Sequence, residues 1–183
     1  QEGEYEPVGG NTTRADVRAT VGGPSGLSVG ISSPAVDLAD FNDYFDESGT
    51  LAGAGSLVAE FADHGRTVST SGRIALSGAR VRRFPLGTIA AGWSTRAGTI
   101  AADLTVTGPT GNVHAAGTIV PTTGDPLEAL RGARYDADVQ AAGVDLGTVL
   151  PGLGFTAPIL GRVTATGHVA GVFPHLAIRG HAA

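Results

Sequence analysis

Apolar and polar side chains alternate at every second position through most of the chain that follows residue 13. In the segment 99–106, Ile100, Leu104 and Val106 fall on one side, whereas Asp103 and Thr105 fall on the other. Successive side chains of a β-strand point to opposite sides of the sheet, so a period of two is typical of strands with one buried face. The pattern recurs along the chain and predicts an all-β protein of about ten strands, each about five to eight residues long.

Glycine and proline separate these alternating segments. The chain holds 29 Gly and 10 Pro, which gather between the expected strands, for example at 22–24, 108–111 and 171–174. Such residues supply the positive or fixed φ angles that tight turns require. Connections this short join neighbouring strands as hairpins, so we expect a mostly antiparallel sheet.

Two segments, 36–45 and 144–150, break the alternation. In each segment an aspartate, Asp37 or Asp145, can accept hydrogen bonds from the first free backbone N–H groups of a helical turn. We therefore expect a short helix at both places.

The chain also repeats itself. Segment 27–38 aligns with 135–146 without a gap, and 49–55 matches 161–167 after a four-residue insertion in the second copy. Units of this kind cannot each bury their own apolar face, so they stack into an array. We divide the chain into a polar N-terminal segment (1–13), a first β repeat unit (14–125) and a second, incomplete β repeat unit (126–183).

The expected fold class is thus all-β, with an elongated, curved and mostly antiparallel sheet and two short helices. An open β-taco and a closed β-sandwich-like repeat array both satisfy the pattern. In either case one side of the sheet is apolar and forms a core or binds lipid. The residues predicted for this side are Leu27, Val29, Ile31, Ile74, Leu76, Trp93, Ile100, Leu104, Val106, Tyr135, Val139 and Val163.

Charge and motifs argue against several classes of function. A net charge of -5 with scattered arginines gives no basic stripe to neutralise phosphates, so we expect no nucleic-acid partner. No Gly-Lys-Ser/Thr sequence occurs, and we expect no nucleotide. No apolar stretch approaches the roughly 20 residues that span a bilayer.

No arrangement of polar residues satisfies the requirements of catalysis. Ser28 stands in a Gly-x-Ser-x-Gly sequence, but it lies inside an alternating segment and no long helix can follow it before Pro34. The chain has no Cys, and its histidines lack the spacing of a zinc site. We therefore expect no catalytic residue, no metal and no cofactor, and a protein that is not an enzyme.

Two copies of a Val-Asp-Leu sequence, 36–38 and 144–146, each follow a strand and precede a Gly-rich strand. Together these segments resemble the repeat of the AsmA/TamB (translocation and assembly module) family. The resemblance spans residues 26 to 183, and its motifs lie at 36–38, 49–55, 135–139, 143–146, 161–167 and 174–180.

The resemblance implies an elongated β-taco in the periplasm, associated with a membrane through parts that lie outside this sequence. Its inner face would hold lipid acyl chains and let them move between the inner and outer membranes, with no catalytic residues. Many inward positions here are Ala or Gly, however, which would suit a closed core. We therefore keep a second hypothesis, a structural accessory subunit that docks on the periplasmic side of a membrane protein complex and stabilises it.

Overall fold

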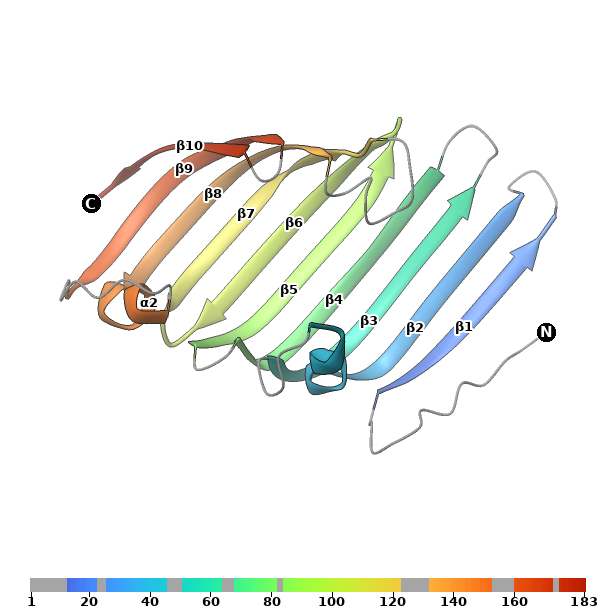
Figure 1. Cartoon of the computed structure of the whole chain (residues 1–183), viewed down its shortest axis with the longest axis horizontal. Helices are drawn as coiled ribbons and strands as arrows, with labels where there is room; N and C mark the ends of the chain where they lie inside the picture. The colour runs from blue at the N-terminus through green and yellow to red at the C-terminus, as the bar shows by residue number, and fades with distance from the viewer. Residues whose placement is uncertain are drawn as a thin grey trace.

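Ten antiparallel strands form one curved, unclosed sheet in which each strand pairs with its neighbours in the sequence (Figure 1). The computed structural model describes residues 13–22, 26–45, 51–63, 68–81, 84–122, 132–152, 160–172 and 175–183. The strands are β1 (Arg14–Val21), β2 (Leu27–Asp37), β3 (Leu51–Asp63), β4 (Val68–Val81), β5 (Phe84–Arg96), β6 (Thr99–Gly108), β7 (Gly111–Val120), β8 (Arg134–Asp145), β9 (Arg162–Val172) and β10 (His175–Ala182).

This architecture confirms the all-β fold class, the antiparallel pairing and the expected number of strands. The expected strand length was wrong, because the strands run from eight residues in β1 to 14 in β4. Gly53 and Gly87 lie inside β3 and β5 at positive φ. The strands therefore continue through these positions.

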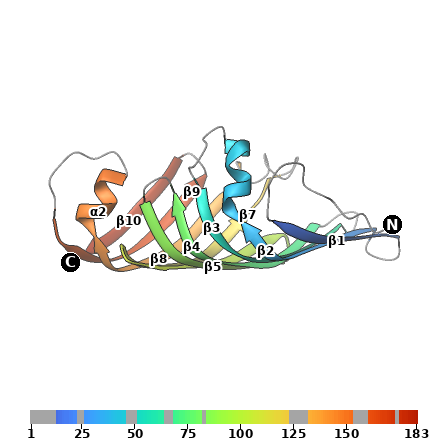
Figure 2. The same ribbon diagram turned by 90° about the horizontal axis from the view of Figure 1, so that it is seen from below.

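Strands β2, β4 and β8 each carry a β-bulge near the same margin of the sheet. The register of β2 shifts between Ser33 and Val36, that of β4 after Leu76, and that of β8 between Ala141 and Val144. Even-numbered strands run in the same direction, so their C-terminal ends lie along one margin. An extra residue in a strand bends it and increases its twist. The three bulges thus help to curve the sheet (Figure 2).

Both expected helices are present, and each begins directly after its aspartate. The 3₁₀ helix η1 (Leu38–Phe45) follows β2, and α2 (Leu146–Gly152) follows β8. The Asp37 carboxylate accepts a hydrogen bond from the N–H of Ala39 at 2.9 Å, and the Asp145 carboxylate accepts one from Gly147 at 2.9 Å. The two helices rise from the same side of the curved sheet (Figure 2). The equivalent caps support the internal repeat at the level of local structure.

The proposed boundary between the two repeat units, at residues 125 and 126, falls outside the described residues, as do residues 1–12. Strands β7 and β8, on either side of that boundary, pair over Asn112–Val120 and Arg134–Ala142. The division into units therefore remains a prediction, and the sheet passes through it without a break in pairing.

Most of the buried side chains lie at the margin that carries the bulges; Ala133, which precedes β8, lies at the opposite margin. Among the described residues, Val36, Leu76, Ala79 and Ala133 are the buried apolar ones, and no large side chain is completely enclosed. The side chain of Asn42 in η1 joins this margin to β3: its Nδ2 donates to the Leu51 carbonyl at 3.0 Å and its Oδ1 accepts from the Leu51 N–H at 2.6 Å. The small core thus lies where η1 meets the sheet.

Candidate functional site

The pairing register brings the predicted apolar residues to one side of the sheet. Directly opposed residues of an antiparallel ladder point to the same side. Ile31 is opposite Ala59, which in turn is opposite Gly72, and Gly72 is opposite Trp93. Continued across all ten strands, the register places every predicted residue from Leu27 to Val163 on this side. We call it the apolar face.

The apolar face extends over all ten strands. Besides the residues named above, this face carries others that the alternation also places there, namely Val17, Ala19, Phe61, Ile89, Ala91, Ala102, Val113, Ala115, Ile119, Ala137, Ala165, Val169, Leu176 and Ile178, and the register adds Leu57, Ala59 and Ala141. Asp63, at the end of β3, is the one acidic or basic residue that the described strands contribute to this face. An uncharged surface of this extent is suited to hydrocarbon.

Most of the apolar face is not covered by the described part of the chain. Leu76 is buried at 6% exposure, but Leu104 remains 37% exposed and Leu27 38%. The other predicted residues, including Trp93 and Val139, are half-buried. In a closed core side chains of this type are fully enclosed. The described residues therefore form an open single layer, and only the margin beside η1 has a protein cover.

Burial shows which side η1 covers. At this margin Val36, Leu76 and Ala79 belong to the apolar face and are buried, whereas Ala54 and Ser77, on the opposite side, are exposed. Because both helices rise from the same side of the sheet, η1 and α2 border the apolar face near its two ends (Figure 2). Between them, no described residue covers the centre of the face around Leu104.

A line of small residues crosses strands β6 to β8 on this face. Ala102 is opposite Gly117, and Gly117 is opposite Ala137. A Cβ atom on Gly117 would lie 2.5 Å from the Ala137 Cβ, so nothing larger fits at this position. On one side the line is flanked by Ile100, Ile119 and Tyr135, and on the other by Leu104, Ala115 and Val139.

Trp93 in β5 lies at the end of this line of small residues, opposite Ala102, and its side chain extends over β4. A Cβ atom on Gly72 would come within 2.3 Å of the Trp93 Cζ2 atom, so the indole packs directly over the glycine. The indole N–H donates to the Thr70 hydroxyl at 3.1 Å. The Thr95 hydroxyl in turn accepts from the Thr70 N–H and donates to its carbonyl, at 2.9 and 3.0 Å. Sequence reasoning missed Thr70 and Gly72, since their contacts with Trp93 depend on the pairing of β4 with β5.

The opposite side, the polar face, carries most of the ionisable side chains of the described strands, such as Asp103 and His168. Nε2 of His114 lies 2.7 Å from an oxygen of Asp103, and both side chains are about half exposed, at 46% and 58%. Nδ1 of His168 lies 3.0 Å from Asp138, and its Nε2 lies 3.7 Å from Asp136. Solvent surrounds these pairs, so they are typical of a hydrated protein surface and not of an acid–base catalytic site.

Replacing His114 with Ala should change the free energy of unfolding by less than about 1 kcal/mol, because exposed ion pairs contribute about 0 to 1 kcal/mol. Chemical denaturation at neutral pH measures this difference. The Asp103→Ala variant is the matched control, and it should give a similarly small value. A loss of several kcal/mol in either variant would contradict the assignment of the pair to an exposed surface.

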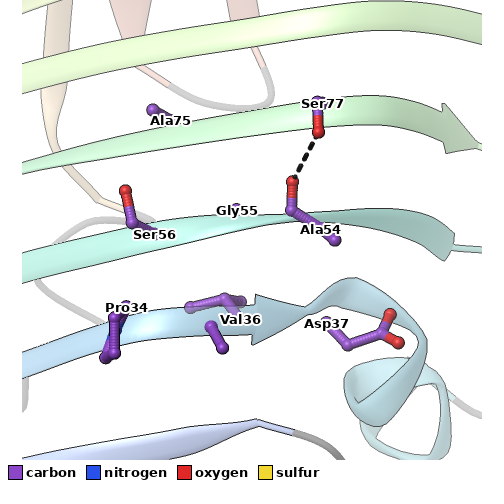
Figure 3. Close-up of a pocket in the computed structure, with 9 residues that line it drawn as sticks. Pro34, Val36, Asp37, Ala54, Gly55, Ser56, Ala75 and Ser77 are labelled. Atoms are coloured by element: carbon purple, nitrogen blue, oxygen red, sulfur yellow. Dashed lines mark hydrogen bonds between the residues drawn. The ribbon is translucent and has the colours of Figure 1, made fainter.

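A shallow hollow on the polar face spans β2 to β4 (Figure 3). Ala54, Ser56, Ala75 and Ser77 line it, and the Ser77 hydroxyl donates to the Ala54 carbonyl at 3.1 Å. Its one ionisable lining residue, Asp37, caps η1. The hollow therefore presents no set of groups for catalysis. In the part of the chain that the structure describes, no three His, Asp or Glu side chains gather where they could hold a metal.

Comparison with protein-family models, with curated proteins and with solved structures gives no match. Among the described residues no helix is long and apolar enough to cross a membrane. The candidate site thus rests on geometry alone: a broad, nearly uncharged face, bordered by two short helices and left open between them.

Proposed function

We propose that the apolar face holds lipid acyl chains, and that the chain is a non-catalytic periplasmic segment of an AsmA/TamB-like protein that supports lipid transport or envelope assembly. One observation carries the proposal: the centre of the face, around Leu104, is apolar and exposed at the same time. Apolar surface of this kind gains free energy when hydrocarbon covers it. The proposed periplasmic location and membrane association rest on the resemblance of the two Val-Asp-Leu segments to the family repeat.

The energetic case does not need specific polar contacts. Transfer of an acyl chain from water onto an apolar surface is worth about 0.8 kcal/mol for each buried CH₂ group. The small residues Ala102, Gly117 and Ala137 leave a low-lying strip where a chain could rest, about 10 Å long over two strand spacings. Ile100 and Leu104 on either side would add contact along its length.

The test is whether phospholipid co-purifies with the protein. Native mass spectrometry and lipid extraction should detect it with the unaltered chain. Leu104→Asp puts a charge at the centre of the apolar face and should lower the bound lipid at least about fivefold, because a carboxylate on hydrocarbon is strongly unfavourable. Thr107→Asp puts the same charge on the polar face of the same strand and should leave lipid binding unchanged.

Equal losses of bound lipid in the two variants would show that the apolar face is not the lipid site. A lipid-free preparation of the unaltered chain would contradict the proposal.

The alternative is a structural accessory subunit that docks on the periplasmic side of a membrane protein complex. The small side chains at Gly117 and Ala137 favour it, because they permit another protein layer to approach closely. Retention of one partner protein without any phospholipid would support this second function.

A further inference from the structure

Among the described strands, the two outer ones, β1 and β10, each have one backbone edge that pairs with no other described strand. In an antiparallel ladder, residues that exchange both hydrogen bonds with the neighbouring strand alternate with residues whose N–H and C=O groups point away from it. Ala183 and Thr164 exchange both bonds, at 2.9 and 3.0 Å. The alternation from this pair leaves the backbone groups of Leu176, Ile178 and Gly180 pointing away from β9. Within the described residues, β9 is the one strand that pairs with β10.

The same reasoning applies to β1. The Gly22 N–H donates to the Gly26 carbonyl at 2.7 Å, and the alternation from this pair leaves Val17, Ala19 and Val21 with backbone groups that point away from β2. On both outer strands, therefore, the residues with outward backbone groups are those that also carry side chains on the apolar face. All eight residues of β1 and all eight of β10 are exposed.

The strand order fixes how two copies can meet. The ten strands alternate in direction, so β1 and β10 are antiparallel to each other. A second copy placed beside the first in the same orientation brings its β1 antiparallel to β10 of the first. Because the outward backbone groups on both strands belong to apolar-face residues, hydrogen bonding across this junction places the two apolar faces on the same side. We infer that β10 of one copy pairs with β1 of a second copy, head to tail.

Charge selects the register of this junction. The pairing tables place Asp16 and Arg179 in the same row across the sheet, a row that passes through Arg73 and Asp138. Pairing without a slip therefore sets Arg179 directly opposite Asp16 of the second copy, with Ile178 opposite Val17. If the second copy is shifted by two residues along the strand, Arg179 lies opposite Arg18 for a shift in one direction and opposite Arg14 for a shift in the other. Like charges directly opposite destabilise a strand pair, so Asp16 favours one register.

The junction also covers apolar surface that each copy leaves exposed. Ile178 is 75% exposed and Val17 is 45% exposed, and they face each other in the favoured register. An unpaired strand edge of this kind is a template for another strand. Because the junction is head to tail, each copy keeps one free edge, and association is open-ended. The inference does not depend on what occupies the apolar face.

Proline substitutions test the junction one edge at a time. Ile178→Pro removes an N–H that points away from β9, and Ala19→Pro removes one that points away from β2, so neither loses an internal hydrogen bond. In sedimentation velocity over a range of concentrations, the unaltered chain should form a series of oligomers, and each variant alone should be a monomer. An equimolar mixture of the two variants should form dimers and nothing larger, since one free β10 edge then meets one free β1 edge.

Other outcomes contradict the inference. Dimers of Ala19→Pro alone would indicate pairing of β10 with β10, and dimers of Ile178→Pro alone would indicate pairing of β1 with β1. A monomeric unaltered chain at all concentrations would rule out pairing through either outer strand. Circular dichroism of each variant checks that the sheet is retained.

A charge exchange tests the register without changing the backbone. Asp16→Arg and Arg179→Asp should each weaken association at least about fivefold, because each places like charges opposite one another. The double variant carrying both changes should return to the affinity of the unaltered chain. If it stays as weak as the single variants, the register and the inferred junction are wrong.

Discussion

Replacement of Gly87 with Ala is expected to destabilise the sheet by about 3 kcal/mol or more, through backbone strain and steric overlap together. Gly87 has a φ of +84° and lies opposite Ala79, at the bulge of β4. A Cβ atom there would lie 2.4 Å from the Thr107 carbonyl oxygen and 2.7 Å from the Gly108 Cα atom. Both contacts are with backbone, which can yield only if the pairing of β5 with β6 shifts. For a chain of this size the midpoint of thermal unfolding should fall by roughly 6 to 12 °C.

Substitutions at two other glycines separate the cost of backbone strain from the cost of steric overlap. Gly98, in the turn between β5 and β6, has a φ of +78° and no atom within 4 Å of its would-be Cβ, so Gly98→Ala should cost only the strain of about 1 to 2 kcal/mol. Gly92 has ordinary strand geometry and its nearest neighbour is 3.8 Å away, so Gly92→Ala should be neutral or slightly stabilising. Equal losses at Gly87 and Gly98 would show that the overlap with β6 is absent.

The features that could be predicted are those that depend on residues close together in the chain. The alternation around Leu104 identifies the apolar side of β6 without knowledge of any partner strand. In the same way, Asp37 and Asp145 satisfy backbone groups two residues ahead of them, and both helices begin where this local rule indicates. The meander also follows from local information, since short connections leave consecutive strands side by side.

The features that could not be predicted depend on the register between strands. Gly87 and Gly98 are the same residue type with nearly the same φ, yet one continues a strand at a bulge and the other forms a turn. Only the position of β6 relative to β5 distinguishes them. The packing of Trp93 on Gly72 is likewise a contact between strands. Whether a second layer covers the apolar face also lies beyond the pattern, because an alternating strand looks the same in an open sheet and in a sandwich.

The distribution of burial over the apolar face leads to the other large expected effect. Leu76→Asp should destabilise the fold by about 4 kcal/mol or more, because it removes a buried leucine and places an unpaired carboxylate in the small core. Leu76 is 6% exposed and lies between Gly55 and Ile89, at the margin that η1 covers. The measurement is urea denaturation followed by circular dichroism. Ser77→Asp, one residue later and on the exposed polar face, should cost less than about 1 kcal/mol and is the matched control.

Leu104→Asp decides between an open and a covered face. The same substitution is made on the same face, but Leu104 is 37% exposed and water can still reach the new carboxylate. Its effect on the free energy of unfolding should therefore be smaller, about 1 to 2 kcal/mol, while the bound lipid still falls at least about fivefold. If Leu104→Asp destabilised the protein as much as Leu76→Asp, another layer would have to cover the centre of the sheet in solution. In that case the apolar side chains would form a core, and the structural role would be favoured over lipid binding.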